Sequence, residues 1–296
     1  MICLLASCLA APVRQVAITI DDLPFVGSPN SAEDIFANTR KLMAPIKAQR
    51  IPVTGFVIGS GLARFPDETS RSILKIWLDA GAELGNHTWT HPDYNHIRPE
   101  AYEAEILKND AYLHKLLDPI KINHFRAPYL HEGLNLASRH RLRSFLKEHG
   151  YQDGPVTFDD EDYLFAHVYN DALKKGDSAT AERVYKEYVP YMESIVRFFE
   201  KRARAVLGRE CAQILLIHAS RLNARAMPDL IEMFRKRHYR FVSLKTALKD
   251  PAYRAPENYA GKSGFSWIHR WGLTKRMSVV WEPDTPAWIV KASSSQ

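Results

Sequence analysis

The sequence predicts an α/β protein in which about seven strands alternate with helices. Short apolar runs rich in β-branched residues recur along the 296 residues, and amphipathic runs of helical length separate most of them. Strands joined through helices are parallel and connected by right-handed crossovers. A closed or nearly closed (β/α) barrel fits this length, and a doubly wound open sheet is the alternative.

Strands are expected where apolar, β-branched runs have strand length, at residues 16–20, 52–58, 82–86, 122–125, 151–158, 213–217 and 239–242. Helices are expected where apolar residues recur at helical spacing, at residues 32–49, 68–80, 99–117, 134–149 and 227–238. A capping-box-like Ser31-Ala-Glu-Asp34 starts the first helix, Pro99 opens the third, and Gly81 and Gly150 follow the second and fourth. Gly59-Ser60-Gly61 ends the second strand.

The chain is expected to form a single domain over residues 13–249. Residues 164–207 are amphipathic and predict an insertion of two helices, with recurrent aromatic residues as core. Residues 250–296 are rich in proline, glycine and tryptophan and predict an irregular C-terminal extension, which contains Trp267, Trp271, Trp281 and Trp288. No internal repeat or low-complexity linker divides the chain.

Composition restricts the class of protein. Hydrophobic residues make up 46% and charged residues 25%, as in ordinary globular proteins. The net charge is +6, and most of the excess lies between Arg221 and Arg276. A solvated helix face explains this excess more simply than an anionic partner, and no nucleic-acid-binding module accompanies it. Cys211 is the only cysteine after residue 12, which excludes a disulfide framework and a cysteine zinc site and indicates buried packing.

The N-terminal residues 1–12 predict export. They are apolar, rich in small residues and too short to span a bilayer, like the tail of a secretory leader with Ala10 and Ala11 at the cleavage site. Leu5-Ala-Ser-Cys8 also resembles a bacterial lipobox, which would leave Cys8 lipid-anchored. A plain first strand is the alternative. We expect a periplasmic or extracellular bacterial protein, with no transmembrane segment in the rest of the chain.

Polar residues follow successive predicted strands at the point where each strand ends. Asp21 and Asp22 follow the first strand, His87 and His91 the third, Arg126 the fourth, Asp159 to Asp162 the fifth, and His218 the sixth. In a parallel barrel these positions converge on one mouth, where such folds place their chemistry. The His87 to His91 spacing lets two imidazoles share a metal if the segment is helical or tightly turned. Taken alone, turn capping by the aspartates and a chance histidine pair are the alternatives.

These segments resemble a known family. In order and spacing, Thr19-Ile-Asp-Asp22, His87-Thr-Trp-Thr-His91, Arg126-Ala-Pro-Tyr129, Asp159 to Tyr163 and Leu216-Ile-His218 are similar to the five motifs of the NodB-homology polysaccharide deacetylases, carbohydrate esterase family 4. The resemblance covers residues 15–248. It implies a distorted (β/α)7 barrel that acts on acetylated polysaccharides or oligosaccharides.

The resemblance also implies a role for each matching residue. Asp22, His87 and His91 would bind a divalent metal, usually zinc, with cobalt or nickel as substitutes. Asp21 would be the general base, Arg126 would hold it, and His218 would be the general acid. Asp162 would orient His218, although Asp159 and Asp160 compete for that role. The Tyr129 N–H would stabilise the oxyanion. Leu216 would line the acetyl pocket, and Tyr163, Pro128 and Asp159 would contact substrate; Tyr163 stands where the family has tryptophan.

The resemblance predicts metal-dependent hydrolysis of N-acetyl groups on GlcNAc-containing glycans such as peptidoglycan or chitin oligomers. An O-acetyl esterase acting on acetylated xylan is one alternative, because the same attack by water cleaves an ester. A glycan-binding protein that kept the fold without the activity is the other.

Overall fold

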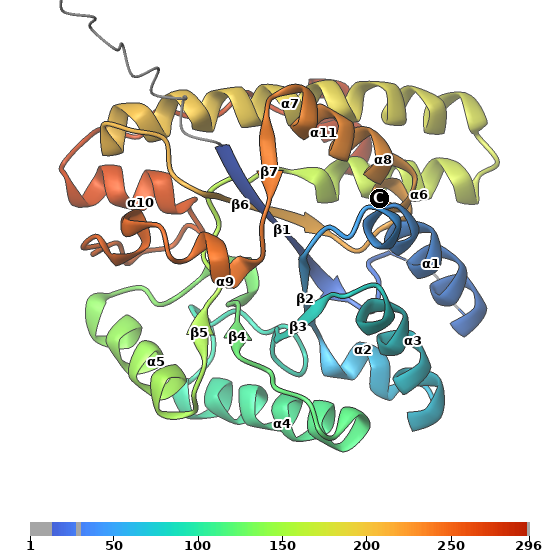
Figure 1. Cartoon of the computed structure of the whole chain (residues 1–296), viewed down its shortest axis with the longest axis horizontal. Helices are drawn as coiled ribbons and strands as arrows, with labels where there is room; N and C mark the ends of the chain where they lie inside the picture. The colour runs from blue at the N-terminus through green and yellow to red at the C-terminus, as the bar shows by residue number, and fades with distance from the viewer. Residues whose placement is uncertain (1–13, 28–30, 295–296) are drawn as a thin grey trace, which may run out of the picture.

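The computed structural model describes residues 14–27 and 31–294, which form a curled, parallel sheet surrounded by helices (Figure 1). The strand order is β5-β4-β3-β2-β1-β6, with β7 also paired to β1, and every pair is parallel. The strands are β1 (Arg14–Leu23), β2 (Val53–Val57), β3 (Glu83–Asn86), β4 (His124–Phe125), β5 (Gln152–Asp153), β6 (Gln213–His218) and β7 (Tyr239–Phe241). The prediction of a distorted (β/α)7-type, single-domain fold is confirmed.

Residues 152–158 connect the two edges of the sheet. The N–H of Gly154 donates to the carbonyl of Phe125 in β4, and the N–H of Leu216 in β6 donates to the carbonyl of Phe158. This connection contradicts the open-sheet alternative. The single strand predicted over residues 151–158 is wrong in detail, because only β5 and an isolated bridge from Phe158 form. Pro155 between them has no N–H to donate to a strand ladder.

Four predicted helices end within two residues of their expected bounds: α1 (Ala32–Ala48), α3 (Asp67–Asp79), α4 (Pro99–Leu117) and α5 (Leu136–Glu148). Helix α8 (Arg221–Lys236) begins six residues before the predicted start, because the Ser220 side chain caps it by accepting the N–H of Asn223. Four short helices were not predicted: α2 (Gly59–Ala63), η1 (Pro128–Leu130), α9 (Leu244–Ala247) and η2 (Pro251–Arg254).

The predicted insertion and extension both pack on the barrel. The insertion consists of two helices, α6 (Asp162–Lys174) and α7 (Ser178–Leu207), as expected. The extension is not wholly irregular, since it contains α10 (Trp267–Thr274) beside α7 and α11 (Ala287–Ser293) beside α6. Trp267 and Trp271 of α10 lie in the core, and the Ser266 side chain caps this helix by accepting the N–H of Ile268.

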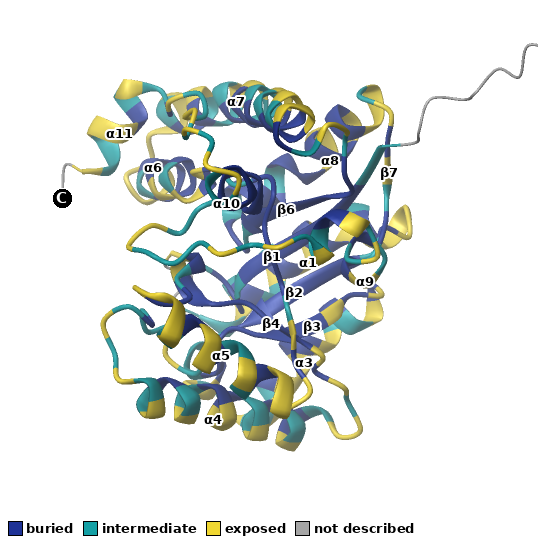
Figure 2. Ribbon diagram, turned by 90° about the vertical axis from the view of Figure 1, so that its left-hand side faces the viewer, coloured by how far each residue is buried: buried dark blue, intermediate teal, exposed yellow. Residues whose placement is uncertain are grey.

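The core lies between the sheet and the inner faces of the helices (Figure 2). Strands β1, β2 and β6 are buried along almost their whole length, as expected for parallel strands covered by helices. Cys211 is buried and free, as its position before an apolar run indicated. Within the described residues, no helix has both the length and the apolar character that a bilayer crossing requires. The predicted leader and lipobox lie outside the described residues.

Candidate active site

A cleft of about 1310 Å³ opens where the carboxyl ends of the strands meet. Its lining includes most of the predicted site residues: Asp21, Asp22, His87, His91, Tyr129, Asp159, Tyr163, Leu216 and His218. Three others lie behind this lining and are buried: Arg126, Pro128 and Asp162. The side chains from successive strand ends therefore converge on one place, as the barrel predicted.

Asp22, His87 and His91 bring three potential metal-ligand atoms together. Oδ1 of Asp22 lies 3.4 Å from Nε2 of His87 and 3.4 Å from Nε2 of His91. The three ligand atoms lie within 4.8 Å of one another, so one cation can contact all of them. Oδ1 of Asp22 is also buried and has no hydrogen-bond partner among the described residues. Because an unpaired buried carboxylate oxygen is unfavourable, this donor set fits a divalent metal ion.

The two histidines are prepared to act as neutral ligands. Nδ1 of His87 lies 2.8 Å from the backbone carbonyl of Arg126 and donates to it, which leaves the Nε2 lone pair facing Asp22. Burial and the neighbouring His87 lower the pKa of His91 to about 4, so its imidazole is neutral at neutral pH. Burial opposes ionisation of Asp22, but its interactions with His87, His218 and His91 hold the pKa of the Asp22 carboxyl well below its ordinary value.

The backbone places these side chains by unusual conformations. Asp22 has φ 62°, and the register between β1 and β2 shifts between Ile20 and Leu23. A regular strand would point neighbouring side chains to opposite faces, so this bulge lets both Asp21 and Asp22 face the cleft. His91 (φ 60°) follows a tight turn rather than a helix. Each such conformation costs about 1 kcal/mol or more in a residue with a side chain, and such costs gather at functional sites.

Arg126 fixes the carboxylate of Asp21. Its Nη1 donates to Oδ1 of Asp21 at 2.6 Å and to the hydroxyl of Thr19 at 2.7 Å. Its Nε donates to the carbonyl of Gly154 at 2.8 Å, and its guanidinium lies over the ring of Phe56. Oδ1 of Asp21 is thus engaged, while Oδ2 lies 3.8 Å from Nε2 of His87. The second oxygen of Asp21 therefore faces the potential metal ligands.

Asp162 holds His218 on the other side of the cleft. Oδ1 of Asp162 accepts from Nδ1 of His218 at 2.6 Å, and Asn223 donates to Oδ2 of Asp162 at 2.7 Å. Neither Asp159 nor Asp160 hydrogen-bonds the His218 ring in the described part of the chain. Burial opposes protonation of His218, but the charge and hydrogen bond of Asp162 raise the pKa of His218 to about 10. His218 can therefore carry a proton at neutral pH, with Nε2 4.0 Å from Oδ2 of Asp22.

Tyr129 and Leu216 form the remaining wall near the metal ligands. Tyr129 (φ 59°) lies in η1, and its ring packs edge-on against His91 at 4.7 Å between centroids. Leu216, Leu130 and Val156 form a small apolar cluster of their own. A methyl group can be accommodated against this cluster without burying a polar atom.

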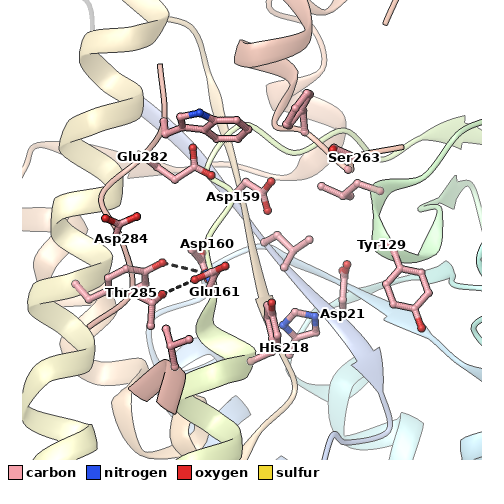
Figure 3. A pocket seen from close by; sticks show the side chains of 18 of the residues that line it. Asp21, Tyr129, Asp159, Asp160, Glu161, His218, Ser263, Glu282, Asp284 and Thr285 are labelled. Carbon is pink, nitrogen blue, oxygen red and sulfur yellow. Dashed lines mark hydrogen bonds between the residues drawn. The ribbon is translucent and has the colours of Figure 1, made fainter. Parts of the chain in front are cut away.

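The C-terminal extension forms the opposite wall of the cleft (Figure 3). It contributes Trp281, Glu282, Asp284 and Thr285, and Thr285 donates its hydroxyl to Glu161 at 2.5 Å. Burial and the charge of Glu282 raise the pKa of Asp159 to about 7. Tyr129, Tyr163 and Trp281 are exposed at the cleft and present aromatic faces to it.

A buried ion network ties this wall to the barrel. Oε2 of Glu132 accepts from Nη1 of Arg270 at 2.9 Å, from Nε of Arg139 at 3.2 Å and from Arg143 at 3.3 Å. Burial opposes ionisation of Glu132, but the charges of the three arginines hold its pKa well below the ordinary value of 4.5. The charge of Glu132 therefore stabilises the folded state above pH 4.5, and this contribution is lost as the pH falls through the depressed pKa.

Glu132→Gln is expected to lower the free energy of unfolding by about 3 kcal/mol at pH 7, because it leaves the buried guanidinium of Arg270 without its anion. The difference from wild type should shrink as the pH falls below 4.5. Urea denaturation at several pH values measures both effects. Glu100→Gln, which removes an exposed partner of Arg141, is the matched control and should change stability by less than about 1 kcal/mol. Equal losses in the two variants would contradict the buried network.

Fold and site together define a (β/α)-barrel protein with a two-histidine, one-carboxylate cluster at its mouth. The family model described as polysaccharide deacetylase matches residues 10–153. This match covers just under half of the chain and confirms the predicted resemblance to the polysaccharide deacetylases. A chitooligosaccharide deacetylase of Bradyrhizobium sp. (strain ANU 289) is 30% identical over 116 residues, which cover 39% of this chain and 46% of that protein. The match therefore spans about half the length of this relative.

Solved structures share the fold at low sequence identity. The peptidoglycan deacetylase PdaC from Bacillus subtilis has a TM-score of 0.50 and 21% identity, with 80% of this chain and 93% of that chain covered. BA3943 from Bacillus anthracis, described as a CE4 family pseudoenzyme, has a TM-score of 0.52 and 15% identity, with 80% and 66% covered. At these identities the likeness shows the fold alone.

Proposed function

We propose that the protein is a metal-dependent deacetylase that removes N-acetyl groups from GlcNAc-containing glycans. The observation that carries this proposal is the presence in one cleft of a carboxylate held by an arginine, a three-ligand cluster and a histidine held by a second carboxylate. Oδ2 of Asp21 lies 3.8 Å from Nε2 of His87, and Nε2 of His218 lies 4.0 Å from Asp22. A base and an acid thus flank the same cluster, as hydrolysis by water requires.

Asp22, His87 and His91 would hold the divalent ion, with zinc as the expected metal and cobalt or nickel as substitutes. When bound, such an ion supplies Lewis-acid chemistry, which polarises the acetyl carbonyl and makes water more acidic. The three protein ligands leave coordination positions open. The role of the protein is to fix these ligands and to surround them with groups that move protons.

In the proposed reaction, Oδ2 of Asp21 accepts a proton from the attacking water while the water oxygen bonds to the acetyl carbon. The N–H of Tyr129 donates to the oxygen that gains negative charge. Nε2 of His218 then gives its proton to the leaving nitrogen, the C–N bond breaks, and acetic acid and a free amine leave. Asp21 afterwards releases its proton to solvent, and His218 takes one up. Asp162 keeps the His218 ring oriented through this transfer, and the Leu216 cluster receives the acetyl methyl.

The cleft favours a neutral glycan chain over a strongly anionic one. Aromatic faces at Tyr129, Tyr163 and Trp281 can stack on sugar rings, and the cleft is larger than one sugar requires. Glu161 and Asp284 add carboxylates to its far wall, which would repel anionic groups. We therefore propose chitin-like oligomers ahead of peptidoglycan as substrate. The Bradyrhizobium relative named for chitooligosaccharides is in line with this choice.

The proposal is tested by incubating the purified chain with chito-oligosaccharides, peptidoglycan fragments and acetylated xylan, and by following acetate release with mass spectrometry. We expect release from chito-oligosaccharides, loss of activity after chelation, and recovery with zinc, cobalt or nickel. Release from xylan alone would favour the O-acetyl esterase. Glycan binding without release from any substrate by the metal-reconstituted chain would favour the non-catalytic alternative.

A further inference from the structure

The turn that carries the Tyr129 N–H is held in an unfavourable backbone conformation. Tyr129 (φ 59°) and Leu130 (φ 55°) are consecutive residues with side chains in the left-handed region. Two such residues in sequence persist only when their surroundings impose the conformation. The surroundings include a part of the chain more than 130 residues away, the segment from Gly261 to Arg270 of the C-terminal extension.

Gly264 brings the backbone of the extension against the peptide that follows Tyr129. A Cβ atom built on Gly264 would overlap the carbonyl oxygen of Tyr129, and would lie 2.9 Å from its carbonyl carbon and 3.0 Å from Cβ of Leu130. Two of these three neighbours are backbone atoms, which cannot rotate away as a flexible side chain would. Any side chain at position 264 therefore has to displace the turn or the extension.

Arg270 of the extension also hydrogen-bonds this turn. Its Nη2 donates to the carbonyl of Leu130 at 2.6 Å, and its Nε donates to the carbonyl of Phe265 at 2.8 Å. Its guanidinium is almost fully buried, lies over the ring of Trp267 and pairs with Glu132. One rigid, planar group thus joins the turn directly to the extension.

The extension is itself anchored to the barrel on both sides of the turn. The N–H of Trp267 donates to the carbonyl of Val156 at 2.7 Å, and the hydroxyl of Ser266 donates to the carbonyl of Thr157 at 2.8 Å. The N–H of Gly261 donates to the carbonyl of Gly133 at 3.1 Å. The segment therefore has fixed points from which it can hold the turn in place.

We propose that Gly264 and Arg270 are positioning residues for the reaction: they set the direction of the Tyr129 N–H toward the oxygen that becomes negatively charged. This inference rests on the proposed function, which gives the Tyr129 N–H its role. It assigns to the C-terminal extension a part in transition-state stabilisation in addition to its part as a cleft wall. Neither residue touches the reacting atoms.

Gly264→Ala tests the proposal, with Gly272→Ala in the same extension as matched control. A Cβ on Gly272 would meet its nearest neighbour, Val206, at 3.4 Å, which is ordinary contact. We expect Gly264→Ala to lower kcat about 100-fold with little change in KM or in zinc affinity, because the oxyanion donor is displaced. Gly272→Ala should keep wild-type kcat. Unchanged kcat in Gly264→Ala would overturn the proposal.

Arg270→Lys is a second test of the proposal. Its readouts, described next, would not change in this pattern if Arg270 had only a structural role. It keeps the charge but loses the planar fork, so kcat should fall while KM stays. For both variants, inhibition by a methylphosphonamidate analogue of the acetamide, which imitates the tetrahedral state, should weaken by the same factor as kcat/KM. Equal weakening of substrate and analogue binding would indicate general damage and would count against the proposal.

The two levels of inference can fail separately. If the wild-type chain releases no acetate from any substrate, the proposed function fails, and the crystal structure of Gly264→Ala then decides the inference. If the peptide that carries the Tyr129 N–H, between Pro128 and Tyr129, is displaced relative to wild type, positioning by the extension is supported. If this turn keeps its wild-type conformation, the inference is overturned, whatever the activity.

Discussion

Asp21→Asn is expected to lower kcat for acetate release by about a thousandfold while zinc still binds. Asparagine has the shape of aspartate and can still accept from Nη1 of Arg126, but its amide cannot take a proton from water. The buried guanidinium of Arg126 loses its anionic partner, so the free energy of unfolding should also fall by about 2 kcal/mol. Steady-state kinetics, zinc titration and thermal unfolding of the purified variant measure the three quantities.

Asp79→Asn is the control for this variant. Asp79 is an exposed carboxylate that pairs with Lys75 on α3 and does not line the cleft, so its loss should leave kcat unchanged. If Asp21→Asn binds zinc and releases acetate at the wild-type rate, Asp21 is not the base.

Asp22→Asn is expected to weaken zinc binding by more than about 100-fold and to abolish acetate release with it. The substitution removes the charge of the carboxylate that faces both histidines. Asparagine tolerates a positive φ better than most residues, so the bulge at position 22 should keep its conformation. Isothermal titration with zinc and the zinc-induced rise in melting temperature provide readouts that do not depend on activity.

Asp93→Asn is a matched control, because Asp93 also stands between two histidines. Its carboxylate accepts from Nδ1 of His131 at 2.8 Å and from Nδ1 of His96 at 2.7 Å. These atoms do not form a three-ligand group in the described residues, so zinc affinity should not change. Wild-type zinc affinity in Asp22→Asn would remove Asp22 from the ligand set.

Local patterns were sufficient for most of the fold. The helix expected at residues 99–117 was predicted to the residue, because Pro99 marks its start and apolar spacing continues to Leu117. The start of α8 was missed because the Ser220 cap is a weak signal when no periodic apolar residue follows at once. The single strand predicted over residues 151–158 is interrupted at Pro155. Whether a proline interrupts a strand depends on the strands that pair with it, and the local sequence does not show these.

The candidate site was predicted only where its residues end strands. Asp21, His87 and His218 each follow an apolar run, so their convergence could be expected from a parallel barrel. Asn223 and Arg270 could not be found in this way. Their hydrogen bonds join residues 61 and 140 positions apart, to Asp162 and to Leu130, and no local pattern records such contacts. The roles implied by the family resemblance stay predictions until the variants are measured.

Arg126 also orients Asp21 independently of the potential metal ligands. Its guanidinium joins β1, through Asp21, to the turn after β5, through Gly154, and it does so without any metal ligand taking part. Contacts within the folded chain therefore orient the carboxylate of Asp21, the proposed base. Because the carboxylate is already held in place, little rearrangement of dipoles is needed during the reaction. Preorganisation of this kind is the main source of electrostatic catalysis.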